Sequence, residues 1–202
     1  MFIRSFFLLL LICLPAAAAP EPPLLLVVGD SLSAAYGLPH GSGWVDLLEQ
    51  RLRQHRPAYR VVNASISGET SQGGAYRIDS LLKKYRPAVV IISLGANDGL
   101  RGLPVSEMRA NLSAMVERCR AQQAKVLLVG MRLPPNYGTA YSKEFHAAYG
   151  EVARRYRIQQ LAFLLQGIAG DPAWFQPDGL HPTAAAQPLL LENVWRILQR
   201  ML

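Results

Sequence analysis

The alternation of short apolar runs with helix-type patterns constrains the fold of this chain more than any other feature. Five runs are almost continuously apolar, as is typical of strands buried on both faces: residues 24–28, 60–62, 88–94, 125–129 and 160–164. Five further segments have helical periodicity: residues 43–54, 74–84, 104–122, 142–156 and 183–201. This β-α-β-α order predicts an α/β fold, a three-layer α/β/α sandwich around a central five-stranded parallel sheet.

The start of the chain has a different pattern. Arg4 precedes an apolar run over residues 6–14, and Pro15 and four alanines follow it. This is the pattern of a secretory signal peptide, and the small residues favour cleavage after Ala18. We therefore expect a signal peptide over residues 1–18 and one mature domain over residues 19–202. The apolar run is too short to span a bilayer comfortably, so we expect no membrane span after cleavage, with an uncleaved anchor as the alternative.

Composition excludes several classes of protein and of partner. A chain that is 50% hydrophobic is not disordered, and the formal net charge of +7 is scattered rather than gathered into one cluster. We therefore expect no nucleic-acid partner; anionic lipid or an acidic substrate suits an exported basic protein better. After cleavage Cys119 is the single cysteine, which excludes an internal disulfide. Its place in the helix expected over residues 108–120 predicts a buried, inert thiol.

Polar and glycine-rich segments follow the expected strands. In a parallel sheet, the loops at the carboxyl ends of the strands build the functional site. Three such segments come directly after strands, and a fourth precedes the last helix: residues 29–33, 63–70, 95–98 and 178–182. We therefore expect these four segments to meet at one edge of the sheet.

Ser31, Asp178 and His181 are the types of residue that nucleophilic catalysis requires. A serine hydroxyl is a weak nucleophile at neutral pH, so it needs a base, and the base needs a group that orients it. We expect Ser31 to open a helix directly after the first strand, and Asp178 to orient His181 towards it. The alternatives are ordinary structural roles, a helix N-cap for the serine and an Asp-Gly turn capped by the histidine.

Gly68 and Asn97 are candidates for an oxyanion hole. Acyl transfer places negative charge on the carbonyl oxygen, so hydrogen-bond donors have to be in place before the reaction. Gly68 lacks a Cβ and brings its backbone N–H close to a ligand, and the Asn97 amide is a neutral donor. We expect the N–H groups of Ser31 and Gly68 and the side chain of Asn97 to hold the oxyanion. The alternatives are a turn glycine and an Asx-turn asparagine.

Taken together, these motifs resemble the GDSL esterase/lipase, or SGNH hydrolase, superfamily over essentially the whole mature chain. The resemblance rests on four blocks in the same order and spacing: Gly29-Asp30-Ser31-Leu32-Ser33, Gly68 in Ser67-Gly68-Glu69-Thr70, Gly95-Ala96-Asn97-Asp98, and Asp178-Gly179-Leu180-His181-Pro182. Further stretches, such as residues 97–102, are similar to the TesA-type branch. The resemblance implies a flavodoxin-like sheet order and a periplasmic monomer, full secretion being the alternative. It also implies hydrolysis of fatty-acyl esters, thioesters and lysophospholipids through an acyl-Ser31 intermediate.

The sequence lacks the motifs of several other classes of enzyme. It contains no Gly-x-Ser-x-Gly elbow, no Walker A motif, no Gly-x-Gly-x-x-Gly and no zinc-type cysteine spacing, so we expect neither cofactor nor metal. Two other functions stay open, a carbohydrate acetylesterase and a non-catalytic periplasmic lipid-binding module. We expect segments 73–80 and 131–141 to shape the acyl site. Asp30 is expected to support its loop rather than to take part in the chemistry.

Overall fold

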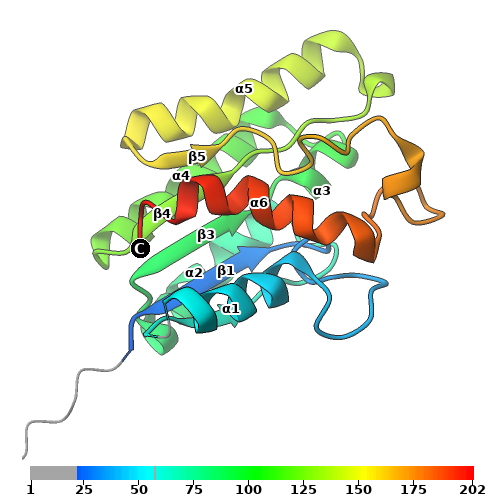
Figure 1. The fold of residues 1–202 in the computed structure, drawn as a ribbon. Coiled ribbons are helices and arrows are strands. Elements are labelled where there is room, and N and C mark those ends of the chain that lie inside the picture. Colours follow the sequence, from blue (N-terminus) through cyan, green and yellow to red (C-terminus); the bar gives the residue numbers. More distant parts are fainter. Residues whose placement is uncertain (1–21, 57) are drawn as a thin grey trace, which may run out of the picture.

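A five-stranded parallel sheet forms the centre of the molecule (Figure 1). The computed structural model describes residues 22–56 and 58–202, so the expected signal peptide, residues 1–18, lies outside the described residues. The strands pair in the order β2-β1-β3-β4-β5, and every pairing is parallel. Their bounds are Leu24–Gly29 (β1), Arg60–Asn63 (β2), Val89–Ser93 (β3), Lys125–Val129 (β4) and Gln159–Leu161 (β5). The predicted α/β fold is confirmed.

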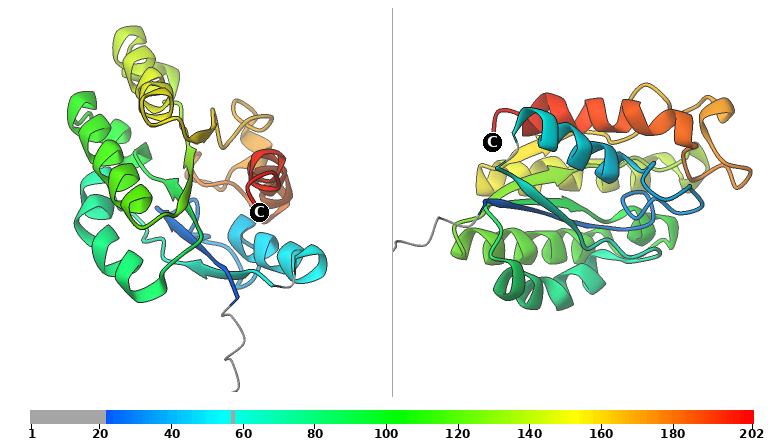
Figure 2. Two further views of the ribbon diagram at one scale, coloured as in Figure 1. Left: turned by 90° about the vertical axis from the view of Figure 1, so that its left-hand side faces the viewer. Right: turned by 60° about the horizontal axis from the view of Figure 1, so that its bottom comes forward.

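Helices cover both faces of this sheet (Figure 2). Helices α1 and α6 pack together on one face, while α2, α4 and α5 lie side by side on the other. The α-helices are Trp44–His55 (α1), Ser71–Tyr85 (α2), Ala96–Leu100 (α3), Val105–Ala121 (α4), Thr139–Tyr156 (α5) and Gln187–Leu198 (α6). Short 3-10 turns are Pro135–Tyr137 (η1), Pro172–Trp174 (η2) and Ala184–Ala186 (η3).

The two central strands show why their sequences are continuously apolar. Every residue of β1 and of β3 is buried, because helices cover the sheet above and below. Removing one Leu, Ile or Val side chain from water in this way stabilises the fold by about 1.5–3 kcal/mol. Sequence alone therefore placed these strands to within two residues of their observed ends.

Three elements differ from the sequence prediction. Strand β5 ends at Leu161, whereas the apolar run predicted a strand over residues 160–164. The chain leaves the sheet there, and the Leu164 N–H donates to Gly130 O at 3.0 Å. The last helix is preceded by the separate turn η3, so α6 starts at Gln187. The short helix α3 lies in a segment that was predicted only as a polar loop.

The strand order places a crevice between β1 and β3. Strand β2 lies on one side of β1, and β3, β4 and β5 follow on the other side. The connections after β1 and β3 therefore run in opposite directions along the sheet, and their loops separate between these two strands. Ligands bind at such switch points in open parallel sheets. Ser31 follows β1 and Asn97 follows β3. Within the described residues, no helix is long and apolar enough to cross a membrane.

Candidate active site

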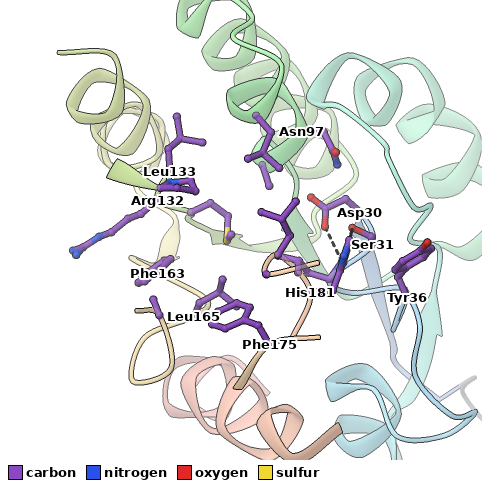
Figure 3. Close-up of a pocket in the computed structure, with 18 of the residues that line it drawn as sticks. Asp30, Ser31, Tyr36, Asn97, Arg132, Leu133, Phe163, Leu165, Phe175 and His181 are labelled. Atoms are coloured by element: carbon purple, nitrogen blue, oxygen red, sulfur yellow. Dashed lines mark hydrogen bonds between the residues drawn. The ribbon is translucent and has the colours of Figure 1, made fainter. Parts of the chain in front are cut away.

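Ser31, His181 and Asp178 form one hydrogen-bonded row across the end of the sheet. Figure 3 shows Ser31 and His181 of this row. The Oγ atom of Ser31 lies 2.8 Å from Nε2 of His181, although the two residues are 150 positions apart. Nδ1 of His181 lies 2.7 Å from Oδ2 of Asp178. A serine, a base and a carboxylate that orients the base stand in the order that proton transfer from serine requires.

The loop that carries Asp178 and His181 explains how the carboxylate is aimed. Oδ1 of Asp178 accepts the backbone N–H groups of Leu180 at 2.9 Å and His181 at 3.0 Å, which leaves Oδ2 for the imidazole ring. Gly179 has a φ of +68°, a conformation in which a side chain would be strained. The Gln176 N–H donates to His181 O at 2.7 Å and closes the loop. The predicted Asp-Gly turn thus exists, and it serves to orient the carboxylate.

The same contacts decide the charge of Asp178. The backbone N–H of His181, then that of Leu180, then the His181 ring lower the pKa of Asp178 to about 2. The carboxylate is therefore ionised at neutral pH and favours the tautomer of His181 that carries its proton on Nδ1. In that tautomer Nε2 is free to accept the proton of Ser31.

Ser31 lies in a turn and not at the start of a helix, which corrects the sequence prediction. The Ala34 N–H donates to Asp30 O at 2.9 Å and the Tyr36 N–H donates to Ser31 O at 3.1 Å. Helix α1 begins only at Trp44. The bond from Ala34 to Asp30 O is of the helical type, but the chain does not continue as a helix. Ser31 therefore lies in a single turn. The predicted N-cap alternative is therefore wrong.

Asp30 is buried directly beside Ser31. It is 2% exposed, and its Oδ1 accepts the N–H of Leu32 at 3.0 Å, which holds the turn that carries Ser31. Burial is the main cause that raises the pKa of Asp30 to about 7, with smaller contributions from the charges of Glu69 and Asp98. The position fits the expected supporting role.

Gly68 and Asn97 meet at the edge of the cavity that Ser31 borders. Gly68 has a φ of +79°, and within residues 22–56 and 58–202 its N–H, like that of Ser31, donates to no protein acceptor. The side-chain amide of Asn97 donates one N–H to Glu69 O at 3.0 Å, and an amide nitrogen carries a second N–H. Asn97 lies in α3 and reaches another loop, so the Asx-turn alternative is wrong.

A cavity of about 710 Å³ extends from Ser31 and His181. The part away from the serine is lined by apolar side chains that come from the loops after β4 and β5 and from the loop after η2 (Figure 3). These side chains are Met131, Leu133, Pro134, Phe163, Leu165 and Phe175. The arrangement places an apolar chain-sized space next to a nucleophilic serine.

Of the two segments expected to shape the acyl site, one does so and one does not. Residues 131–135 line the cavity, whereas no residue of segment 73–80 is among the described residues that line it. Segment 73–80 is part of α2, and its buried face packs against α4. The prediction for this segment is wrong, because its helix lies against the face of the sheet rather than at the end of the strands.

Sequence reasoning missed Tyr36, Phe163, Leu165 and Phe175. The Tyr36 ring lies 4.7 Å from the His181 ring, centroid to centroid, and covers its outer side. The aromatic Phe175 belongs to a loop that has no motif of its own. Phe163 was assigned to a strand and Leu165 directly follows that run; the one available signal was the position of the run before the Gly167-Ile168-Ala169-Gly170 turn.

Other reactive side chains lie away from this row. Nδ1 of His146 is 3.2 Å from Met131 O, so this histidine supports the loop after β4. Cys119 is buried, as predicted, and burial raises the pKa of its thiol to about 12, which disfavours the reactive thiolate. Among the residues that the structure describes, no group of three or more His, Cys, Asp or Glu side chains is arranged to hold a metal ion.

Comparison with known proteins agrees with this geometry. Residues 27–188 match the GDSL-like Lipase/Acylhydrolase family. The chain belongs to this family. It is 51% identical to Esterase TesA of Pseudomonas aeruginosa over 176 residues, which are 87% of this chain and 88% of the relative. It is 38% identical to Thioesterase 1/protease 1/lysophospholipase L1 of Escherichia coli (strain K12) over 173 residues, 86% of this chain and 82% of the relative.

The fold of a solved relative agrees with the fold of this chain. A crystal structure of TesA superposes with a TM-score of 0.87 at 51% identity, covering 89% of this chain and 99% of that chain. The predicted resemblance to the GDSL/SGNH hydrolases is confirmed, and with it the expectation of an enzyme that hydrolyses carboxylic esters.

Proposed function

We propose that this protein is a serine hydrolase that cleaves fatty-acyl esters and thioesters through an acyl-Ser31 intermediate. The observation that carries the proposal is the hydrogen-bonded row Asp178–His181–Ser31 at the mouth of a large apolar cavity. The row supplies a nucleophile and its base, and the cavity supplies room for the acyl chain.

In the first half of the reaction, Oγ of Ser31 attacks the carbonyl carbon of the substrate. The Ser31 proton passes to Nε2 of His181 across the 2.8 Å hydrogen bond. The ionised Asp178 stabilises the imidazolium that forms, since its carboxylate lies 2.7 Å from Nδ1. Collapse of the tetrahedral intermediate breaks the bond to the alcohol or thiol, and His181 returns the proton to this leaving group.

The negative charge of the tetrahedral intermediate falls on the former carbonyl oxygen. The free N–H groups of Ser31 and Gly68 and the second N–H of the Asn97 amide are the donors we assign to it. Donors fixed in advance of the reaction lower the barrier, because no reorganisation is needed when the charge appears. The hydrogen bond from Asn97 to Glu69 O fixes the amide in this way.

In the second half, water attacks the acyl-Ser31 ester. His181 takes a proton from the water, the bond between Ser31 Oγ and the acyl carbon breaks, and the proton returns to Oγ. The carboxylic acid leaves and the enzyme is restored. Neither half needs a metal or a cofactor.

The size of the cavity favours a long acyl chain over an acetyl group. About 710 Å³ lined by leucine, phenylalanine and methionine is far more than two carbon atoms fill, and each buried methylene contributes about 0.8 kcal/mol. The names of the relatives, an esterase and a thioesterase/lysophospholipase, agree with fatty-acyl substrates. We therefore place acyl thioesters and lysophospholipids, rather than acetylated carbohydrates, among the substrates.

We further propose that the enzyme is exported to the periplasm as a monomer that starts at Ala19. The n-region, apolar run and alanines of residues 1–18 support export. N-terminal sequencing of the exported protein and its elution volume on size exclusion test both statements. A start at Met1 or Phe2, or a dimer at micromolar concentration, would contradict them.

A substrate panel tests the proposed function. The purified mature protein is assayed with nitrophenyl esters of graded chain length, an acyl-CoA and a lysophospholipid, beside Ser31→Ala as the matched control. We expect kcat/KM to rise from acetyl to longer chains, and kcat of the variant to be about 10⁴–10⁶ lower with every ester. Highest activity on acetylated carbohydrate would favour the acetylesterase, and tight lipid binding without turnover would favour a lipid-binding module.

A further inference from the structure

The turn that carries Gly68 is exposed, yet its role requires a fixed position. The Glu69 N–H donates to Ile66 O at 3.1 Å, and Gly68, with its positive φ, occupies the third position of this four-residue turn. Ile66, Ser67 and Gly68 are all exposed, so packing does little to hold them. An exposed turn opens readily, whereas a donor for an oxyanion has to be preorganised.

Asn97 of α3 and Arg101, the residue that directly follows this helix, hold the turn. Asn97 and Arg101 are four residues apart, so they lie on one side of the helical segment that begins at Ala96. Asn97 donates to Glu69 O at 3.0 Å, and Nη2 of Arg101 donates to Gly68 O at 2.8 Å. Successive carbonyl groups of the turn are thus fixed from α3, which follows the neighbouring strand β3.

Among the described residues, Arg101 has no other partner that would account for its position. Its side chain is exposed, and within the described residues it forms no ion pair and no second side-chain hydrogen bond. A Cβ built on Gly68 would lie 3.8 Å from Nη2, which shows that the guanidinium lies directly against the turn. Ordering a long arginine side chain costs up to about 2 kcal/mol in conformational entropy.

We propose that Arg101 is a positioning residue for the oxyanion hole. Its guanidinium holds the Gly68 carbonyl and so restrains the Gly68–Glu69 peptide on one side of Gly68. The Gly68 N–H lies in the Ser67–Gly68 peptide on the other side, and a turn that is held in place keeps this N–H directed at the cavity. Arg101 acts through Gly68 and does not touch the reacting atoms. The inference rests on the proposed function, since it needs an oxyanion at this place.

Three variants test this role: Arg101→Ala, Arg101→Lys, and Arg53→Ala as the control. Arg53 is an exposed arginine that pairs with Glu49 within α1, away from the cavity, so its loss removes a surface contact of similar kind. Active sites are counted by titration with a fluorophosphonate, so that kcat refers to folded, reactive enzyme. A neutral nitrophenyl ester is the substrate.

We expect Arg101→Ala to lower kcat by about 10-fold to 10²-fold, because a misplaced donor loses most of the stabilisation that it gives the transition state. KM should stay within about 2-fold of wild type, since the ground-state carbonyl uses the donor little. A trifluoromethyl ketone inhibitor, whose adduct with Ser31 carries an oxyanion, should weaken by the factor lost in kcat/KM. Arg101→Lys should recover part of the loss, and Arg53→Ala should behave as wild type.

Wild-type kcat per titrated site in Arg101→Ala would overturn the inference, whether or not the melting temperature falls. A rise in KM confined to acyl-CoA would also overturn it, because it would mean that Arg101 binds an anionic leaving group directly. Failure of the proposed function has a different signature, namely full activity in Ser31→Ala. An inactive Ser31→Ala beside a fully active Arg101→Ala therefore refutes only the role of Arg101.

Discussion

The two ends of the cavity are built on different principles. At the catalytic end the side chains are held by hydrogen bonds of 2.7–3.0 Å, as in the pairs His181–Asp178 and Asn97–Glu69. At the acyl end, the apolar side chains of Leu133, Phe163 and Leu165 border the space. Catalysis at the first end depends on the direction of each hydrogen bond, and binding of the acyl chain at the second depends on volume and apolar surface.

This difference predicts how each end responds to substitution. Hydrogen-bonded geometry has a steep dependence on position, so single changes at the catalytic end should act on kcat and act on all substrates alike. Apolar burial grows with area, so changes at the acyl end should be graded and should depend on chain length. The predictions below test this contrast, from the largest expected effect to the smallest.

Removing the nucleophile should have the largest effect. We expect Ser31→Ala to lower kcat by about 10⁴–10⁶ with every ester, as for other serine hydrolases in which the row acts as a unit. Peptide mapping after treatment with a fluorophosphonate should find the label on Ser31. A label on Ser33, Ser65 or Ser67 would show that the catalytic end is assigned to the wrong serine.

Asn97→Ala should lower kcat by about 10²–10³, the loss found for one oxyanion donor. KM should change little, because the charge that the amide binds exists only in the transition state. The melting temperature should fall slightly, as the hydrogen bond to Glu69 O is lost too. A collapsed melting temperature with near wild-type kcat per titrated site would instead show that Asn97 only holds the turn.

Filling the acyl end should discriminate between substrates. Ala169 is exposed and lines the cavity, so Ala169→Trp adds volume there without disturbing the core. If two or three methylenes are excluded, kcat/KM for long esters should fall by about 10-fold to 10²-fold. The acetyl ester should be unaffected, and Ala173→Trp, at an exposed position outside the lining, serves as the control. An equal loss for acetyl and long esters would contradict the separation of the two ends.

The catalytic end should also have a cost in stability that depends on pH. Asp30 has its pKa raised from 3.8 to about 7 by burial, so the folded protein binds this proton more tightly than the unfolded chain does. Its contribution to stability is fully present below pH 3.8 and is lost as the pH rises through about 7.

Urea unfolding of Asp30→Asn beside wild type measures this cost. The difference in the free energy of unfolding should move in favour of the variant by no more than about 1.4 kcal/mol per pH unit between about pH 4 and about pH 7. Above that range it should level off. Ala169→Trp is the matched control, because it changes no titratable group. A difference that is independent of pH would show that burial does not raise the pKa of Asp30.

The fold was predictable where a pattern is local. Continuous apolar runs located β1, β3 and β4 within two residues, because strands buried on both faces have few other sequences available to them. The strand predicted over residues 160–164 was wrong in its second half, because β5 ends at Leu161. Phe163 lies in this run and is apolar because it lines a cavity, and periodicity does not distinguish a cavity wall from a strand.

The sequence by itself determined the chemistry of the catalytic end. Ser31, Asp178 and His181 are recognisable because nucleophile, base and orienting carboxylate have to be particular residue types, and Asp178 and His181 share one turn. Gly68 is recognisable because its backbone conformation excludes a side chain. These are constraints on individual residues, and a sequence records them directly.

Only the tertiary structure decided what surrounds that chemistry. The packing of Tyr36 on His181, the contact of Arg101 with Gly68 O and the apolar wall of Leu133 and Phe163 each join segments far apart in the chain. Many residue types satisfy such contacts, so no local motif marks them. Their geometry follows from the strand order, which brings the ends of β1, β3, β4 and β5 to one edge of the sheet.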